Sequence, residues 1–186
     1  MLNAVASLNL SDPTLLRQAN YIDGKWVQAD SGKTIVVKNP ATGEPVGEVP
    51  AMGAAETKRA IESAAKAYPA WRAMLAKERG TILRKLNDLM LANAGDLGII
   101  MTAEQGKPLA ESKGEIAYAA SFIEWFAEEG RRVYGDTIPQ NAKGRRIVVT
   151  KEPIGVFAAM MRPATPSGWR NTIAALFGTA DVVVEP

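Results

Sequence analysis

Apolar residues recur along this chain with two different spacings, and the change between them divides the sequence into parts. Between residues 20 and 50, short β-branched and aromatic runs are separated by turn dipeptides such as Asp23-Gly24 and Ser31-Gly32, which predicts short strands. From residue 53 to residue 130, apolar residues recur three and four positions apart, which predicts helices. Beyond Gly130 the strand pattern returns on both sides of the polar loop QNAKGRR, which predicts an extended hairpin.

Four helices are expected in the middle of the chain. They cover residues 53–68, 77–94, 96–104 and 108–129. Pro69 is expected to stop the first helix, because a proline inside a helix removes a backbone hydrogen bond. Gly106 is expected to cap the third helix in a left-handed conformation, and Pro108 suits the first turn of the fourth.

The residues expected in the core lie on one face of each later helix. In the second helix they are Ile82, Leu83, Leu86, Leu89 and Met90, and in the third they are Leu97, Ile100 and Met101. In the fourth they are Ile116, Ala120, Ile123 and Ala127, widened by Ala119, Phe122 and Phe126. A stripe this wide predicts a core helix with a large buried face.

The last 34 residues are expected to form one βαβ unit. The run from Ile154 to Met160 is continuously apolar, as a buried parallel strand would be, and residues 182–184 begin another such strand. Between them Trp169, Ile173, Leu176 and Phe177 make one helical face. The fold class is therefore α/β with an incomplete parallel sheet, whose apolar edge is expected to be exposed and whose chain is expected to fray after Pro163.

Composition and charge exclude several kinds of site. The 186 residues have a net charge of +2 and contain neither cysteine nor histidine. Within these residues a thiolate nucleophile, a Cys-ligated metal and a Ser-His-Asp site are therefore impossible. No run of 18 apolar residues predicts a membrane helix, and the start of the chain is a poor signal peptide, so the expected location is the cytoplasm.

The only local concentration of charge is basic and lies around the expected hairpin. It consists of Arg131, Arg132, Lys143, Arg145, Arg146 and Lys151. The simpler interpretation is a solvated hairpin surface, and the alternative is contact with nucleic acid. No aromatic platform for base stacking interleaves the cluster, so neither a nucleic acid nor a membrane is expected as a partner.

Six segments in order resemble the N-terminal part of the aldehyde dehydrogenase superfamily, and within it the NAD(P)-dependent succinate-semialdehyde dehydrogenase branch. They are YIDGKWV (21–27), VVKNPATGEPVGEVPAMGAAET (36–57), AWRAMLAKERGTILRKL (70–86), MTAEQGKPLAESKGEI (101–116), YAASFIEWFAEEGRRVYGDTIP (118–139) and KEPIGV (151–156). The resemblance implies a Rossmann-type cofactor domain that is helix-rich and carries an extended β-hairpin.

The same resemblance implies a division of the chain into four parts. Residues 1–19 would be an N-terminal arm, and residues 20–132 the N-terminal hairpin and helices of the cofactor-binding domain. Residues 133–152 would be an oligomerisation hairpin that docks onto another copy or onto a full-length aldehyde dehydrogenase subunit. Residues 153–186 would be the truncated start of the parallel sheet.

The family's chemistry requires groups that this sequence lacks or replaces by other residues. A cysteine thiolate attacks the aldehyde, NAD or NADP accepts hydride, a glutamate activates water, and an asparagine in a Pro-Trp-Asn-Phe-Pro motif stabilises the oxyanion. Here MMRPATPSG (160–168) stands at the asparagine motif, and Glu185 stands at the cofactor lysine. No catalytic residue is therefore assigned, and neither cofactor is expected to bind this piece tightly.

One substrate contact is implied by the resemblance. Arg170 falls where succinate-semialdehyde dehydrogenases place an arginine that grips the substrate carboxylate. A guanidinium suits that task because it donates two parallel hydrogen bonds to a carboxylate. The alternative interpretation is an ordinary arginine on the surface or at a helix end.

Three hypotheses follow from these residues. In the first, the chain is the N-terminal fragment of a protein that oxidises succinate semialdehyde to succinate in 4-aminobutyrate degradation, inactive alone and derived from a truncated or frame-disrupted gene. In the second, it is a binding module that associates with full-length aldehyde dehydrogenase subunits. In the third, it is an α+β scaffold that shares only ancestry with the family.

Overall fold

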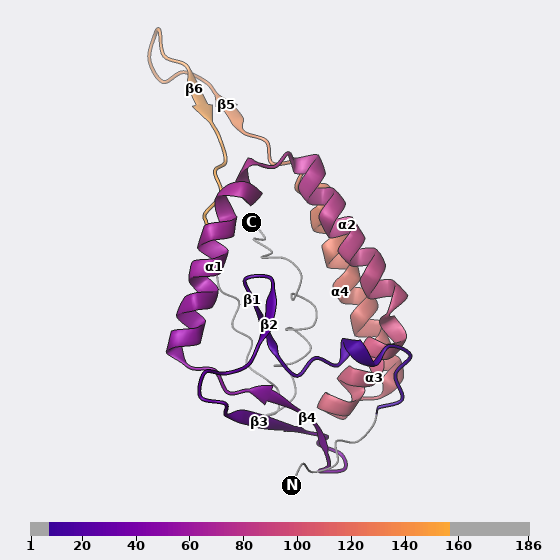
Figure 1. The fold of residues 1–186 in the computed structure, drawn as a ribbon. Coiled ribbons are helices and arrows are strands. Elements are labelled where there is room, and N and C mark those ends of the chain that lie inside the picture. The colour runs from indigo at the N-terminus through magenta and orange to yellow at the C-terminus, as the bar shows by residue number, and fades with distance from the viewer. Residues whose placement is uncertain (1–7, 157–186) are drawn as a thin grey trace.

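Four helices and three antiparallel strand pairs make up residues 8–156, the part of the chain that the computed structural model describes. The elements are η1 (Pro13–Leu15), β1 (Asn20–Ile22), β2 (Lys25–Val27), β3 (Thr34–Lys38), β4 (Pro45–Pro50), α1 (Ala54–Ala73), α2 (Ala76–Ala92), α3 (Ala94–Gln105), α4 (Leu109–Glu129), β5 (Asp136–Ile138) and β6 (Ile147–Val149). Helix α1 lies apart from α2 and α4, the pair β3–β4 lies at one end, and the pair β5–β6 projects from the other end (Figure 1).

The two N-terminal strand pairs form where the turn residues predict them. The β1–β2 hairpin turns at Asp23 and Gly24, whose φ angles are 51° and 74°, and the rings of Tyr21 and Trp26 pair across it at 5.2 Å. The β3–β4 pair has an irregular register between Val37 and Lys38. One face of β3–β4 is buried, because Val37, Val46 and Val49 pack with Ala103 of α3.

The main helical core lies where α4 packs on α2 and α3. Leu97 and Met101 of α3 form a buried cluster with Ile116 of α4, which is fully buried. Side chains and backbones also join across this core. Asn87 of α2 donates a buried hydrogen bond to the carbonyl of Ala120 (2.8 Å), and Thr102 donates one to the Ser112 hydroxyl (2.9 Å). The satisfied polar groups fix how the three helices are paired.

Helix ends follow the expected capping signals in α3 and α4. Gly106 has φ 73° and ends α3 in the left-handed conformation, as predicted. Pro108 is the N-cap of α4, and the helix begins at Leu109. Ile116, Ala120 and Ala127 are buried and Ile123 is half-buried, so the predicted stripe of α4 is confirmed.

The prediction that Pro69 stops the first helix is wrong. Helix α1 continues through Pro69 to Ala73. Proline removes the hydrogen bond that its own N–H would have given to the carbonyl four residues earlier, and its ring crowds the same carbonyl. That carbonyl belongs to Ala65, an exposed residue, so water is available to it in place of the missing donor.

Four large side chains predicted to be buried are exposed. Ile82 and Leu89 of α2 are 39% and 52% exposed, and Phe122 and Phe126 of α4 are 47% and 40% exposed. Met90 is buried as predicted, and the residues of α2 that meet α4 closely are Gly80 and Asn87, which were not predicted. Periodicity identified apolar positions but not which of two apolar faces the neighbouring helix covers.

The predicted parallel strand is not present where the structure describes the chain. Ile154 and Val156 lie in irregular backbone and are 68% and 38% exposed. Every strand pair among residues 8–156 is antiparallel. The rest of the expected βαβ unit, residues 157–186, lies outside the described residues.

A carboxylate is one of the groups that hold the N-terminal arm in place. Asp96, in the first turn of α3, accepts hydrogen bonds from the backbone N–H groups of Ser11 (3.0 Å) and Asp12 (2.8 Å). These two donors lower the pKa of the Asp96 carboxyl, because they stabilise its charged form. The short helix η1 follows directly, so the arm enters the fold at a defined point.

We predict that Gly80→Ala lowers the free energy of unfolding by about 1–3 kcal/mol. A Cβ atom at Gly80 would lie 2.8 Å from the carbonyl oxygen of Ala127, so α2 and α4 would have to move apart. Urea unfolding followed by circular dichroism measures the change.

Gly114→Ala is the matched control, because Gly114 also lies inside a helix but has no heavy atom within 4 Å of its Cβ position. It should be neutral or stabilise the fold by up to about 1 kcal/mol through helix propensity and reduced unfolded-chain entropy. Equal effects of the two substitutions would show that the approach of α2 to α4 is not close-packed at Gly80.

Candidate functional site

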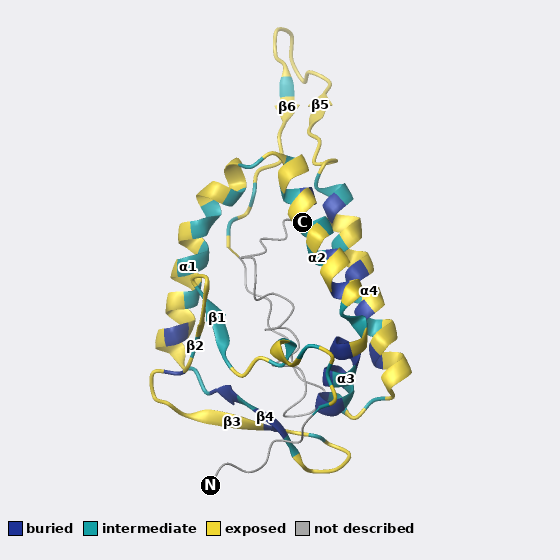
Figure 2. Ribbon diagram, turned by 45° about the vertical axis from the view of Figure 1, so that its right-hand side comes forward, coloured by how far each residue is buried: buried dark blue, intermediate teal, exposed yellow. Residues whose placement is uncertain are grey.

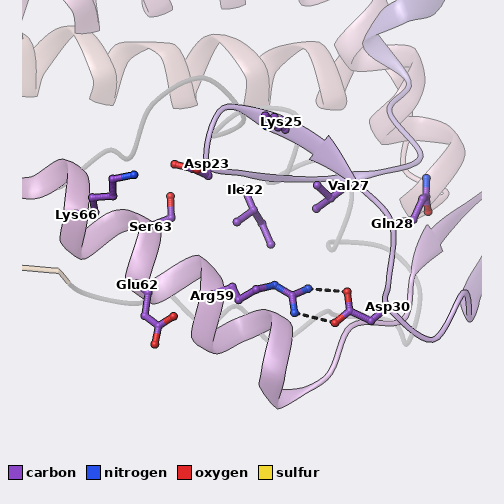
Figure 3. Close-up of a pocket in the computed structure, with 10 residues that line it drawn as sticks. All are labelled: Ile22, Asp23, Lys25, Val27, Gln28, Asp30, Arg59, Glu62, Ser63 and Lys66. Carbon is purple, nitrogen blue, oxygen red and sulfur yellow. Dashed lines mark hydrogen bonds and ion pairs between the residues drawn. The ribbon is translucent and has the colours of Figure 1, made fainter.

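A hollow of about 620 Å³ lies between the β1–β2 hairpin and one face of α1 (Figure 3). The hairpin and the loop after it contribute Ile22, Asp23, Lys25, Val27, Gln28 and Asp30, and α1 contributes Arg59, Glu62, Ser63 and Lys66. The α1 residues are three and four positions apart, so they lie on neighbouring turns of the helix. Its volume is within the usual range for small-molecule sites.

The two ends of this hollow differ in whether their charged side chains form an ion pair. At one end the Arg59 guanidinium donates two hydrogen bonds of 2.7 Å to the two carboxylate oxygens of Asp30. At the other end Ser63 and Lys66 point from α1 toward Asp23 of the hairpin turn, with Ile22 and Val27 between the two ends (Figure 3). The arrangement offers hydrogen-bonding groups at its rim and two aliphatic side chains inside.

Glu56 joins two of the segments that line the hollow, the start of α1 and the loop after β2. Its side chain is 6% exposed and accepts hydrogen bonds from the backbone N–H groups of Gly53 (3.0 Å) and Asp30 (3.1 Å). It therefore caps the N-terminus of α1 and ties the loop after β2 to that helix. The sequence signal, a glutamate three residues after the N-cap Gly53, was available but was not used to predict this contact.

Folding lowers the pKa of two carboxyl groups here, those of Glu56 and Asp30. Backbone N–H donors, its own first and then those of Gly53 and Asp30, lower the pKa of Glu56. The hydrogen bonds from Arg59 lower the pKa of Asp30, and the same contact raises the pKa of Arg59. All three groups therefore stay charged at neutral pH and hold their positions. Within residues 8–156 no group of three or more His, Cys, Asp or Glu side chains is placed to hold a metal ion.

The β5–β6 hairpin is a second candidate surface. It projects from the end of the helices, and almost all of it is exposed (Figure 2). Exposed apolar side chains stand on it, including Tyr134 (67%), Ile138 (45%) and Val148 (61%). An isolated two-stranded hairpin is marginally stable in water, and exposed apolar side chains on it make it a candidate contact surface.

The residues singled out from the sequence are not brought together in the described part. Arg170, Glu185 and the segment MMRPATPSG lie outside residues 8–156, so the structure does not place them. Arg132 of the basic cluster is paired with Glu129 (2.6 Å), whereas Arg145 and Arg146 line a hollow at the tip of the hairpin. Among the described helices none has the length and apolar character needed to cross a bilayer.

Comparison with known proteins confirms the resemblance inferred from the six segments. The model of the aldehyde dehydrogenase family matches residues 26–184. This chain therefore belongs to the aldehyde dehydrogenase family, and its α/β class, with helices and small antiparallel strand pairs, agrees with part of that fold.

Similar proteins act on semialdehydes, to judge from their names. The chain is 58% identical over 181 residues to the glutarate-semialdehyde dehydrogenase of Pseudomonas aeruginosa. The matched region covers 96% of this chain and 38% of that protein. It is 58% identical over 153 residues to the NADP(+) succinate-semialdehyde dehydrogenase of Escherichia coli, covering 82% of this chain and 32% of that one. The succinate-semialdehyde dehydrogenase structure from Burkholderia pseudomallei superposes with a TM-score of 0.77 at 62% identity, over 79% of this chain and 30% of that chain. The chain thus spans less than two fifths of these relatives.

We predict that the free energy of unfolding falls as the pH is lowered through the acidic range, and that Glu56→Gln reduces this dependence. A carboxyl whose pKa is lowered by folding stabilises the protein above the ordinary glutamate pKa of 4.5, and this contribution is lost as the pH falls through the lower folded value. Glutamine cannot ionise, so the variant should be less stable at neutral pH. Its free energy of unfolding should also depend less on pH in the acidic range. Urea unfolding at a series of pH values measures both effects.

Glu62→Gln is the control on the same helix, because Glu62 is exposed and faces only Lys58, at 3.8 Å. It should follow the wild-type curve closely, since such exposed pairs contribute little. A Glu56→Gln curve parallel to that of the wild type would exclude the capping carboxylate as a source of acid sensitivity.

Proposed function

We propose that this chain forms the N-terminal part of an NAD(P)-dependent dehydrogenase that oxidises succinate or glutarate semialdehyde to the dicarboxylate. The observation that carries this proposal is 58% identity to a glutarate-semialdehyde dehydrogenase across 96% of the chain. Of the two substrates we propose succinate semialdehyde first, whose oxidation to succinate belongs to 4-aminobutyrate degradation. The cytoplasm is the proposed location.

The 186 residues alone are proposed to be inactive. They contain no cysteine, so they supply no thiolate to attack an aldehyde. In the proposal, the nucleophile, the water-activating glutamate and most of the site for NAD or NADP come from residues outside these 186. The relative from Escherichia coli carries NADP(+) in its name, which supports a dinucleotide for the complete protein. Arg170 is retained as the proposed contact to the substrate carboxylate.

A second role, as a binding module, is favoured by the β5–β6 hairpin. We propose that residues 133–152 associate with a neighbouring subunit, either a second copy or a full-length aldehyde dehydrogenase. Supporting this, Val148 is 61% exposed, and its strand pair makes no extensive contact with another described element. Residues 1–19, 20–132 and 153–186 are proposed as the arm, the cofactor-domain helices and the start of the sheet.

We predict that a chimera of residues 1–156 of this chain with the remainder of the Pseudomonas aeruginosa glutarate-semialdehyde dehydrogenase oxidises glutarate semialdehyde. The described residues are similar enough to those of the relative that they should support its remaining parts. Formation of NADH or NADPH, followed by absorbance, measures the activity.

The 186-residue chain is the control and should form no reduced cofactor with either semialdehyde. A chimera that assembles like the relative but has no activity would argue against the proposed dehydrogenase role. Turnover by the 186-residue chain would contradict the proposal that it is inactive alone.

We predict that Val148→Asp weakens association with the full-length Pseudomonas aeruginosa relative by about tenfold or more, which is about 1.4 kcal/mol. The substitution replaces an exposed apolar side chain that the proposal buries with a charged one, while the exposed position leaves folding nearly unchanged. Sedimentation velocity of mixtures gives the affinity, and Thr81→Asp, an exposed change on α2, is the control. Equal binding by the Val148 variant would place the contact elsewhere.

A further inference from the structure

The tip of the β5–β6 hairpin encloses a small basic hollow. Its volume is about 400 Å³, and its lining residues are Ile138, Gln140, Gly144, Arg145 and Arg146. Gly144 has φ +80°, a conformation that favours glycine, and the Arg145 N–H closes a turn on the carbonyl of Ala142 (3.3 Å). The turn therefore places two consecutive guanidinium groups at one hollow.

These arginines have no counter-charge in the described part of the chain. Arg59, Arg72, Arg84 and Arg132 each form an ion pair with a carboxylate. No ion pair or side-chain hydrogen bond between described residues involves Arg145 or Arg146, and the lining contains no acidic residue. Two adjacent guanidinium groups repel each other, and a carboxylate that accepts hydrogen bonds from both would relieve that repulsion.

The charge of the chain is distributed in a way that suits contact between copies. Residues 139–146 carry three cations and no acid, so a net charge of +2 for the whole chain leaves −1 for the rest. Exposed carboxylates without an ion pair among the described residues stand on the body, including Glu44, Asp88 and Glu111. A basic tip that projects from a slightly acidic body is complementary to the body of another copy (Figure 1).

We propose that the hollow formed by Arg145, Arg146 and Gln140 is a carboxylate-binding site that takes an acidic side chain from a second copy of this chain. This inference rests on the proposed association through the hairpin and adds a polar contact to its apolar one. The exposed apolar side chains of the hairpin supply burial, and the arginine hollow fixes the orientation and selects an acidic surface. Arginine is suited to this task because its planar donors match a carboxylate bidentately.

The test is self-association of the full 186-residue chain, measured by sedimentation equilibrium at several sodium chloride concentrations. Wild-type association should weaken as salt is added. Arg145→Gln with Arg146→Gln should raise the dissociation constant about tenfold and make it less dependent on salt. Lys77→Gln with Lys85→Gln removes the same charge from α2, and the dissociation constant and its salt dependence should stay as in the wild type. Circular dichroism checks that each variant folds.

The outcomes separate this inference from the proposed hairpin contact. If Val148→Asp disrupts self-association and the arginine double variant does not, the carboxylate site is wrong and the hairpin contact stands. If the chain binds the full-length relative through Val148 but never a second copy, the choice of partner is wrong. If neither the Val148 variant nor the arginine variant alters any association, both proposals fail. If the lysine variant had the same effect as the arginine variant, the association would depend only on net charge, and the proposed carboxylate site would be wrong.

Discussion

The close contact between α2 and α4 is the constraint on which the described structure depends. Gly80 allows the backbone of α4 to approach, since a Cβ atom there would meet the Ala127 carbonyl at 2.8 Å. Seven residues further along α2, Asn87 donates to the Ala120 carbonyl, so the same contact is both close and specific. Arg84, between them, pairs with Glu124 (2.8 Å) and with Glu128 at the rim. With α2 and α4 fixed in this way, α3 buries Leu97 and Met101 against Ile116. Ala103 of α3 packs against the buried valines of the β3–β4 pair.

Carboxylates help to attach parts of the chain that lie outside this helical core. Asp96 holds the N-terminal arm through two backbone N–H groups, and Glu56 holds the loop after β2 to the start of α1. Each carboxylate lies in the first turn of a helix, where backbone donors are free and the helix dipole favours negative charge. Charged contacts of this kind position segments without needing a large apolar area. They therefore define the hollow beside α1, which is formed by a hairpin and a helix with little shared core.

The described residues carry an exposed hairpin but not the groups that the family uses for its chemistry. The sequence relationship concerns a dehydrogenase of which this chain spans less than two fifths, and the groups that the family uses for chemistry are not among the described residues. What the described residues do present is a helical body and a projecting hairpin that is exposed on nearly all sides (Figure 2). Apolar side chains on the strands and unpaired arginines at the tip give that hairpin the two components of a specific protein contact, burial and orientation.

The sequence by itself determined most of the described elements and the family to which the chain belongs. Turn dipeptides located the hairpins, Gly106 ended α3 as predicted, and the spacing of Ile116, Ala120 and Ala127 identified the buried face of α4, because these signals are local. Only the tertiary structure decided which apolar residues are covered. Leu89 and Phe122 lie outside the helix contacts, while Gly80 and Asn87 lie inside them, because close packing selects by shape and hydrogen bonding rather than by hydrophobicity. Pro69 likewise remained inside α1 because the carbonyl that it leaves without a donor belongs to an exposed residue.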